Sequence, residues 1–305
     1  MTDIIAFGEL LVDLIGQEQG QLNEIETLQK RPGGAPANVA VAAARLGRDV
    51  RLIATVGNDS FGDFLIDAIE RHGVRTDHIE RVQHRTTLAF ASLDEESRPD
   101  FMFYRDNHAD IHIQPQQLDL DILQDADVFH FGSLSLTHDP VRSTLFHALQ
   151  QLDDTFVSCD PNLRDDLWDQ DLERNLRNAL DHVDLLILAQ DELDRLFNGD
   201  TAREQARNAI QKHSISEVAV THGRDGAELH TADQSWQADA LEAEVVDTTG
   251  AGDAFAAGYL DAWIADRGAE ERLRQGNAVA SRCVEQHGAM EALPTRDELS
   301  EVMQQ

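Results

Sequence analysis

The stretch "EVVDTTGAGDAFAAGYL" (residues 244–260) holds a glycine-rich turn between a strand-like and a helix-like segment. Its first four residues are typical of a strand, and the small and apolar residues from Ala251 onward are typical of a helix. The glycines Gly250 and Gly252 are therefore predicted to lie at a helix N-terminus. There the free backbone N–H groups and the positive end of the helix dipole form a site for an anion. A glycine-rich turn that only packs in the core is an alternative that this stretch alone leaves open.

Two familiar phosphate-binding loops are excluded by the residues around these glycines. A Walker loop needs a lysine after its last glycine, but the only lysines of the chain are Lys30 and Lys212. A dinucleotide-binding loop needs a third glycine where Phe255 stands, which also argues against a dehydrogenase.

The carboxylate of Asp253 directly follows the glycines, although a carboxylate repels phosphate. This arrangement suits removal of a proton from a hydroxyl that attacks a phosphoryl group. The backbone N–H groups of Ala251, Gly252 and Asp253 would hold the charge of that phosphoryl group. We therefore interpret Asp253 as a general base beside an anion hole.

Short runs rich in Val, Ile and Phe alternate along the chain with segments of helical periodicity. The predicted strands are 4–8, 50–57, 127–132, 156–160, 184–189 and 217–223. The predicted helices between them are 36–47, 61–73 and 140–152. This alternation predicts an α/β fold, a three-layer sandwich whose mainly parallel central sheet is covered on both faces.

The region 83–113 breaks the alternation, because "TTLAFASLDEESRPDFMFYR" holds two strand-like runs around a polar turn with Pro99. We interpret it as a hairpin. Together with the segment of about 10–32 it would form a small sheet outside the main layer, a lid. No repeat or linker is evident, so the chain is predicted to be one domain with a lid.

The composition is that of a globular protein, with 41% apolar residues. No apolar run approaches the roughly 18 residues of a membrane span, and the first residues do not resemble a signal peptide. Cys159 and Cys283 lie in apolar surroundings without metal-ligand spacing, which indicates buried thiols in a reducing compartment. We therefore expect a cytoplasmic protein.

The charge is extreme, because 57 acids face 25 Lys and Arg residues and the formal net charge is −32. Such a polyanion should bind neither nucleic acid nor an anionic membrane through its general surface. The acids are dispersed along the chain and lysine is almost absent. This pattern favours a halophilic protein, from a cytoplasm at molar salt, over an ordinary acidic protein.

Several motifs in order resemble the PfkB (ribokinase-like) carbohydrate kinases. "DTTGAGDAFAAGYL" is similar to their C-terminal signature, and "RPGGAPANVAVAAARLG" (31–47) with "VGNDSFGDFL" (56–65) is similar to their N-terminal one. The likeness runs from "GELLVD" (8–13) to "GAMEALPT" (288–295), and with "RTTLAF", "FHFGSLSL" and "DPNLRDDLW" it is greatest to fructokinases. The resemblance implies a single ribokinase-like domain over 1–305 and an ATP-dependent kinase that converts fructose to fructose 6-phosphate.

The resemblance also implies roles for single residues. The catalytic base and the anion hole are matched by Asp253, Gly250, Ala251 and Gly252. Sugar-binding positions are matched by Asp13, Gly33, Gly34 and Asn38. Carboxylates and amides suit this task because they accept and donate hydrogen bonds in fixed geometry, and glycine lets the backbone approach the ring.

The nucleotide and its ions are implied in the same way. ATP-binding positions are matched by Thr221, Gly223, Gly226, Asn277 and Ala280; for the first three, an ordinary hairpin turn is the alternative. Asp247 and Thr249 match a monovalent-cation site, expected to hold K⁺ with carbonyl groups of 283–292. Glu192 matches a residue that holds Mg²⁺ through water, but Ala189 replaces the usual asparagine. We therefore expect the nucleotide phosphates to hold most of the Mg²⁺.

Arg105 and Arg164 leave the identity of the sugar open between fructose and 2-keto-3-deoxygluconate, because arginines can bind an anionic substrate. In 2-keto-3-deoxygluconate kinases similar arginines contact a carboxylate, whereas Asp13 and "FGSLSL" favour neutral fructose. Salt bridges in so acidic a chain are a further explanation for both arginines. Ribose or nucleoside kinases, and a non-catalytic sugar or nucleotide sensor, rank below these candidates. The resemblance also implies a homodimer formed through the lid.

The net charge predicts that thermal stability and activity rise together with KCl toward molar concentrations. The Debye length falls from about 30 Å at about 0.01 M salt to about 3 Å at about 1 M, so repulsion among the acids is screened. Melting temperature and activity should be measured across this range, with NaCl as the comparison salt. Values that stay flat or fall would favour an ordinary acidic protein.

Overall fold

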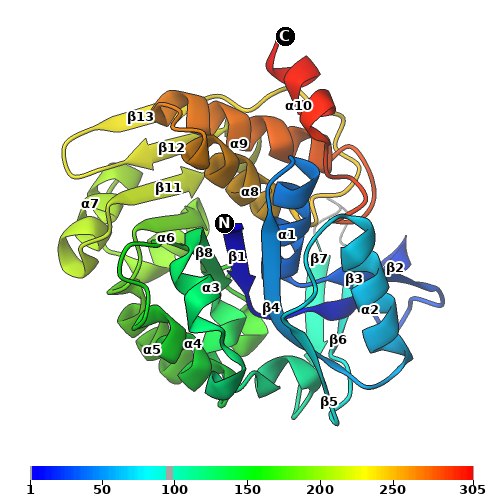
Figure 1. The fold of residues 1–305 in the computed structure, drawn as a ribbon. Helices are drawn as coiled ribbons and strands as arrows, with labels where there is room; N and C mark the ends of the chain where they lie inside the picture. Colours follow the sequence, from blue (N-terminus) through cyan, green and yellow to red (C-terminus); the bar gives the residue numbers. More distant parts are fainter. Residues whose placement is uncertain (1, 94–98, 305) are drawn as a thin grey trace.

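The computed structural model describes residues 2–93 and 99–304, and in it a central sheet lies between two layers of helices (Figure 1). The strands of this sheet are β1 (Thr2–Phe7), β4 (Val50–Gly57), β5 (Ile79–Val82), β8 (Ala126–Gly132), β9 (Phe156–Asp160), β10 (Leu185–Ala189), β11 (Glu217–Thr221), β12 (Ala227–His230) and β13 (Ser235–Ala238). Their order is β13-β12-β11-β10-β9-β8-β1-β4-β5. Neighbours from β5 to β11 are parallel, and β12 and β13 add an antiparallel edge. The predicted α/β class is confirmed.

The sheet is buried on both faces because consecutive side chains of a strand point to opposite sides. In β1, Ile4 and Ala6 join one apolar core, while Ile5 and Phe7 join the other. The first core is covered by α1 (Ala35–Arg45), α2 (Ser60–Arg71), α8 (Ala251–Ile264), α9 (Ala269–Cys283) and α10 (Arg296–Met303). The second is covered by α3 (Leu120–Gln124), α4 (Val141–Leu149), α5 (Gln170–Leu180), α6 (Gln190–Leu196) and α7 (Ala202–His213). None of the described helices is long and apolar enough to cross a membrane.

Short 3₁₀ segments connect several of these elements. They are Ala109–His112, Pro115–Gln117, Ser133–Leu136, Asp165–Leu167 and Gly223–Asp225.

A second, four-stranded sheet stands beside the main one and forms the lid, drawn in blue and cyan in Figure 1. It consists of β2 (Leu11–Gln19), β3 (Leu28–Gly33), β6 (Leu88–Leu93) and β7 (Pro99–Tyr104), in the order β3-β2-β6-β7. Because β6 and β7 pair antiparallel, the predicted hairpin is present. Pro99 begins β7, and the predicted turn at 94–98 lies outside the described residues.

The prediction of a strand at 244–247 is wrong. The backbone N–H groups of Val246 and Asp247 both donate to the carbonyl of Val284, at 2.8 and 3.2 Å, so this segment packs against the C-terminal end of α9 and pairs with no described strand. Val245 is 59% exposed, which explains why an apolar pair gave a misleading pattern. Helix α8 is therefore entered from a loop. The strand predicted at 217–223 ends at Thr221, because His222 and Gly226 close a hairpin turn.

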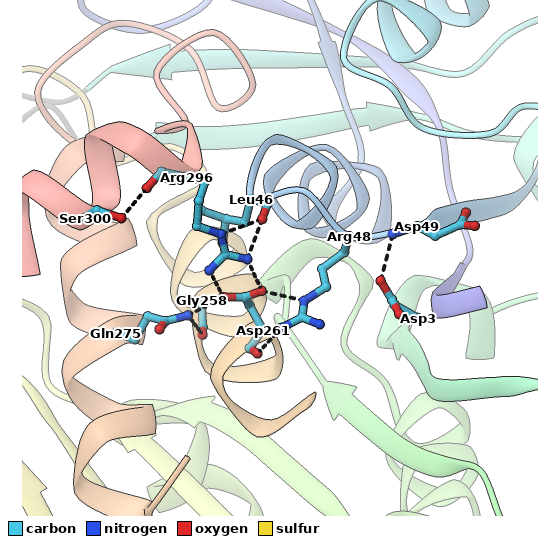
Figure 2. Close-up of polar contacts among 9 residues, drawn as sticks. All are labelled: Asp3, Leu46, Arg48, Asp49, Gly258, Asp261, Gln275, Arg296 and Ser300. Atoms are coloured by element: carbon cyan, nitrogen blue, oxygen red, sulfur yellow. Dashed lines mark hydrogen bonds and ion pairs between the residues drawn. The ribbon is translucent and has the colours of Figure 1, made fainter. Parts of the chain in front are cut away.

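The far end of α8 is anchored by a buried carboxylate, Asp261, whose side chain is 1% exposed (Figure 2). Arg296, at the start of α10, donates to it through Nη1 and Nη2 at 2.7 and 2.6 Å. Arg48 from the α1–β4 connection and Gln275 from α9 donate to it as well. Arg296 also donates through Nε to the carbonyl of Leu46 at 2.8 Å. One carboxylate thus joins four segments.

Replacing Asp261 with Asn should lower the free energy of unfolding by about 3 kcal/mol, because the buried carboxylate is lost as the counter-charge of Arg48, which is 17% exposed, and of Arg296, which is 45% exposed. The matched control is Asp171→Asn, which removes the same charge from an exposed pair with Arg174. That change should cost at most about 1 kcal/mol. Urea denaturation at one fixed KCl concentration measures both. Equal losses in the two variants would contradict the assignment.

Candidate active site

A cavity of about 290 Å³ lies where the lid meets the core. Its walls come from β2, the N-termini of α1, α6 and α8, and the segment 160–164 that follows β9. The carboxyl ends of β9 and β10 open into it, which is where open α/β sheets bind ligands. Residues far apart in the sequence therefore meet in one place.

Asp253 lies in the first turn of α8, lines this cavity and is 5% exposed. Burial raises the pKa of its carboxyl group to about 6, while a hydrogen bond from Asn38 and the charge of Arg164 oppose that rise. The Nδ2 group of Asn38 lies 2.7 Å from the Oδ2 atom of Asp253. A carboxylate with this pKa is mostly ionised at neutral pH and is still a better proton acceptor than an ordinary aspartate.

The N-terminus of α8 depends on Gly250, which has a φ of 81° and is the N-cap. A Cβ atom at this position would lie 2.6 Å from that of Ala289, so only glycine fits. The N–H of Ala251 donates to the carbonyl of Thr248 at 3.2 Å. Among the described residues, the backbone N–H groups of Gly252 and Asp253 have no such partner and can bind an anion. The anion site therefore has two of the three predicted N–H groups, without that of Ala251.

The predicted sugar-binding residues converge on the same cavity. Asp13 of β2 lines it, and burial raises the pKa of this carboxyl to about 7 against the charge of Arg164. Gly33 packs behind Asp13, since a Cβ atom there would lie 1.9 Å from Oδ2. Gly34 has a φ of 111° and lines the cavity at the start of α1.

Among the polar residues that line the cavity and were not predicted as site residues are Glu9, Asp160 and Asn162. Glu9 accepts a hydrogen bond from the N–H of Ala35 at 3.0 Å, and burial raises its pKa to about 7. Burial and the neighbouring carboxylates also raise the pKa of Asp160. These residues lie at or just after strand ends, in "GELLVD" and "DPNLR", and that position is the signal that could have found them.

The two arginines lie in different surroundings. Arg164 is half-buried and lines the cavity. Arg105 is buried beside it at the base of the lid hairpin, where its guanidinium pairs with Asp110 and also donates to Thr137 and to the carbonyl of Leu134. For Arg105, the structure therefore favours the salt bridge that was the alternative to a substrate contact.

A second cavity, of about 1010 Å³, adjoins the first. All five residues predicted to bind ATP line it: Thr221, Gly223, Gly226, Asn277 and Ala280. Asn277 donates to the carbonyls of Ala238 and Asp239, both at 3.0 Å, and so fixes one wall. Thr221, Thr248, Ala251 and Gly252 line both cavities. The two cavities therefore meet at the N-terminus of α8.

The predicted cation position is a buried pocket of oxygen atoms beside the α8 turn. Asp247 accepts hydrogen bonds from the N–H groups of Thr249 and Gly288, at 2.9 and 3.0 Å. The Oγ1 atom of Thr249 is buried without a hydrogen-bond partner. The Sγ atom of Cys283 contacts the carbonyls of Thr249 and Ala289, so these oxygens lie close together. A carboxylate, a hydroxyl and carbonyls are donors that fit a hard cation.

Glu192, the residue predicted to hold Mg²⁺ through water, lies in the first turn of α6. Its Oε2 atom accepts the N–H of Ala189 at 2.9 Å, and its Oε1 atom accepts the N–H of Leu163. Burial raises its pKa. No group of three or more His, Cys, Asp or Glu side chains in the described ranges is placed to hold a metal ion.

Comparison with known proteins adds independent findings. The model of the pfkB family of carbohydrate kinases matches residues 1–296. The probable fructokinase-2 of Arabidopsis thaliana is 33% identical over 305 residues, which cover 96% of this chain and 93% of that protein. The ATP-bound fructokinase of Xylella fastidiosa superposes with a TM-score of 0.88 at 30% identity, covering 99% and 98% of the two chains. A double mutant of Vibrio cholerae O395 fructokinase, with fructose, ADP and potassium bound, superposes with a TM-score of 0.88 at 30% identity, covering 99% of this chain and 98% of that chain.

Proposed function

The chain belongs to the pfkB family of carbohydrate kinases, and on that premise we propose that it transfers the γ-phosphoryl group of ATP to fructose. One observation carries the proposal: an acid-lined cavity and a larger cavity meet at the glycine-rich N-terminus of α8, beside Asp253. The sugar would occupy the first cavity and the nucleotide the second. The reacting hydroxyl and phosphoryl groups would then meet at the helix N-terminus.

The step follows from this placement. A sugar hydroxyl gives its proton to Asp253, and its oxygen attacks the γ-phosphorus. The bond between that phosphorus and the β–γ bridging oxygen breaks, so the products are a sugar phosphate and ADP. The N–H groups of Gly252 and Asp253 offset charge on the phosphoryl oxygens. Glu192 would hold Mg²⁺ through water, where the ion neutralises phosphate charge when bound.

The charge of the first cavity supports a neutral sugar. Among the described residues, six acids and a single arginine, Arg164, line it; the acids are Glu9, Asp13, Asp160, Asp191, Glu192 and Asp253. A substrate carboxylate would be repelled by most of this wall, and Arg105 is already engaged by Asp110. Fructose therefore ranks above 2-keto-3-deoxygluconate, and the fructose-bound Vibrio cholerae fructokinase agrees with that order.

A potassium ion at Asp247 and Thr249 is part of the proposal. The buried, unpartnered Oγ1 of Thr249 supports it, and the Vibrio cholerae fructokinase structure contains potassium. The dimer through the lid, the halophilic character and the cytoplasmic location remain predictions. On the lid, Met102 and Tyr104 of the edge strand β7 are 43% and 53% exposed, which suits a second copy of the chain.

The proposed substrate is tested by a panel of sugars and sugar acids with coupled detection of ADP, at molar KCl. We expect the highest kcat/KM for fructose, with 2-keto-3-deoxygluconate turned over poorly. A higher value for the keto acid would reverse the ranking and assign Arg164 to its carboxylate. Absence of turnover with every sugar would favour a non-catalytic sensor.

Replacing Asp253 with Asn keeps the shape and removes the base, so kcat should fall about 10²–10⁴-fold while ATP still binds. In the wild type, kcat/KM should rise with pH through about 6, because burial raises the pKa of this base and only its ionised form accepts the proton. The control is Asp171→Asn, which removes an exposed acid that lines neither cavity and should change kcat only slightly. Activity of Asp253→Asn within a few-fold of wild type would exclude Asp253 as the base.

A further inference from the structure

Both oxygen atoms of Asp253 face the amide of an asparagine. The Nδ2 group of Asn38 donates to Oδ2 at 2.7 Å, and the Nδ2 group of Asn162 lies 3.5 Å from Oδ1. The two asparagines reach the carboxylate from α1 and from the segment after β9, while Asp253 belongs to α8. The first contact is a strong hydrogen bond and the second is at the limit of one.

Each asparagine is anchored through its own backbone. Asn38 is buried in the first turn of α1, where its N–H donates to the carbonyl of Gly34 at 2.8 Å. Asn162 has a φ of 45°, in the left-handed region, and its N–H donates to Oδ1 of Asp160 at 3.0 Å. Asparagine tolerates this region better than most residues, and such conformations gather at functional sites. The backbone that carries each amide is therefore fixed before a substrate arrives, and the Oδ1 atom of Asn38 is buried without a hydrogen-bond partner, so Asp253 is the group that orients the Asn38 amide.

The other groups that face Asp253 are mostly acids. Asp13 of β2 and Asp160 at the end of β9 repel its charge, Cys283 at the end of α9 lies nearby, and Arg164 attracts it. A second cation here would hold the carboxylate firmly but would lower its basicity. A neutral amide fixes the orientation at a smaller cost in basicity, because it adds a donor without adding a charge.

We propose that Asn38 and Asn162 are positioning residues for Asp253, and that they leave its Oδ1 atom to receive the proton of the sugar hydroxyl. Oδ2 is held by the shorter hydrogen bond, whereas Oδ1 has only the 3.5 Å contact and is the oxygen that a hydroxyl can engage. This inference rests on the proposed function for the proton, but the amide contacts stand without it. It gives Asn38 a role in addition to the sugar contact expected from the sequence.

The test uses two variants that remove an amide and keep the local shape. Asn38→Leu replaces the side chain with an apolar one of the same branching. Asn162→Gly keeps the left-handed backbone, which glycine adopts freely. For Asn38→Leu we expect kcat to fall about 10- to 100-fold and the acid limb of kcat/KM to move up by about one pH unit, since a charge-assisted donor is lost. For Asn162→Gly, which is not an expected sugar contact, the KM for fructose should change less than about threefold. Asn162→Gly should shift the limb in the same direction by less.

The matched control is Asn175→Leu, because Asn175 is a buried asparagine of α5 that donates to the carbonyl of Leu136 at 3.1 Å. It should lower the melting temperature and leave the acid limb unmoved. The titration of Asp253 is also followed without substrate, as the infrared carboxyl band of each variant minus that of its Asp253→Asn counterpart. An upward shift in both asparagine variants supports the inference even if no sugar is turned over, a result that would overturn only the proposed function. An unmoved titration, or a tenfold rise in KM with an unmoved limb, would overturn the inference.

Discussion

The N-terminus of α8 can lie where it does only because a loop from the far end of the chain packs against it. Asp247 accepts N–H groups from Thr249 and from Gly288, which joins the two loops. Gly250 adopts a positive φ against Ala289, where no larger residue fits. From this turn the helix begins at once, so the free N–H groups and Asp253 stand in a fixed relation. Both cavities open at the N-terminus of α8, which is where the proposed phosphoryl transfer would take place.

The same helix is held at its other end. Asp261 collects donors from the α1–β4 connection, from α9 and from α10, all on the face of the sheet that α8 covers (Figure 2). Buried ion pairs of this kind are costly to form and more costly to break. Their effect here is to fix the position of α8, so that Asp253 and Asn38 of α1 keep their separation. The chemistry at one end thus depends on packing at the other.

Negative charge acts on two scales in this protein. Across the whole chain the formal charge of −32 calls for solvent cations, because few basic residues are present to offset it. Inside the first cavity the carboxylates are buried, so desolvation raises the pKa values of Glu9, Asp13 and Asp253, and repulsion by other carboxylates adds to the rise at Glu9 and Asp13. That rise suits a base and a binder of neutral hydroxyls. Among the acids that face Asp253, two neutral amides donate toward it and one arginine attracts its charge.

Local patterns in the sequence determined the alternation of strands and helices, the lid hairpin and the glycine-rich start of α8. Each of these is a property of a few consecutive residues: side-chain period, glycine conformation and helix capping. The motifs also placed the predicted sugar and nucleotide residues around two adjoining cavities.

Which side chains meet depends on how the elements pack in three dimensions. In the folded chain the apolar pair Val245–Val246 lies in a loop beside α9, and Arg105 pairs with Asp110. The packing of the elements also brings Glu9, Asp160 and Asn162 to the first cavity. It also set the amide of Asn38, 215 residues away in the sequence, against Asp253. Such contacts depend on how whole layers pack, and neither residue type nor local spacing records the distance between two atoms on different elements.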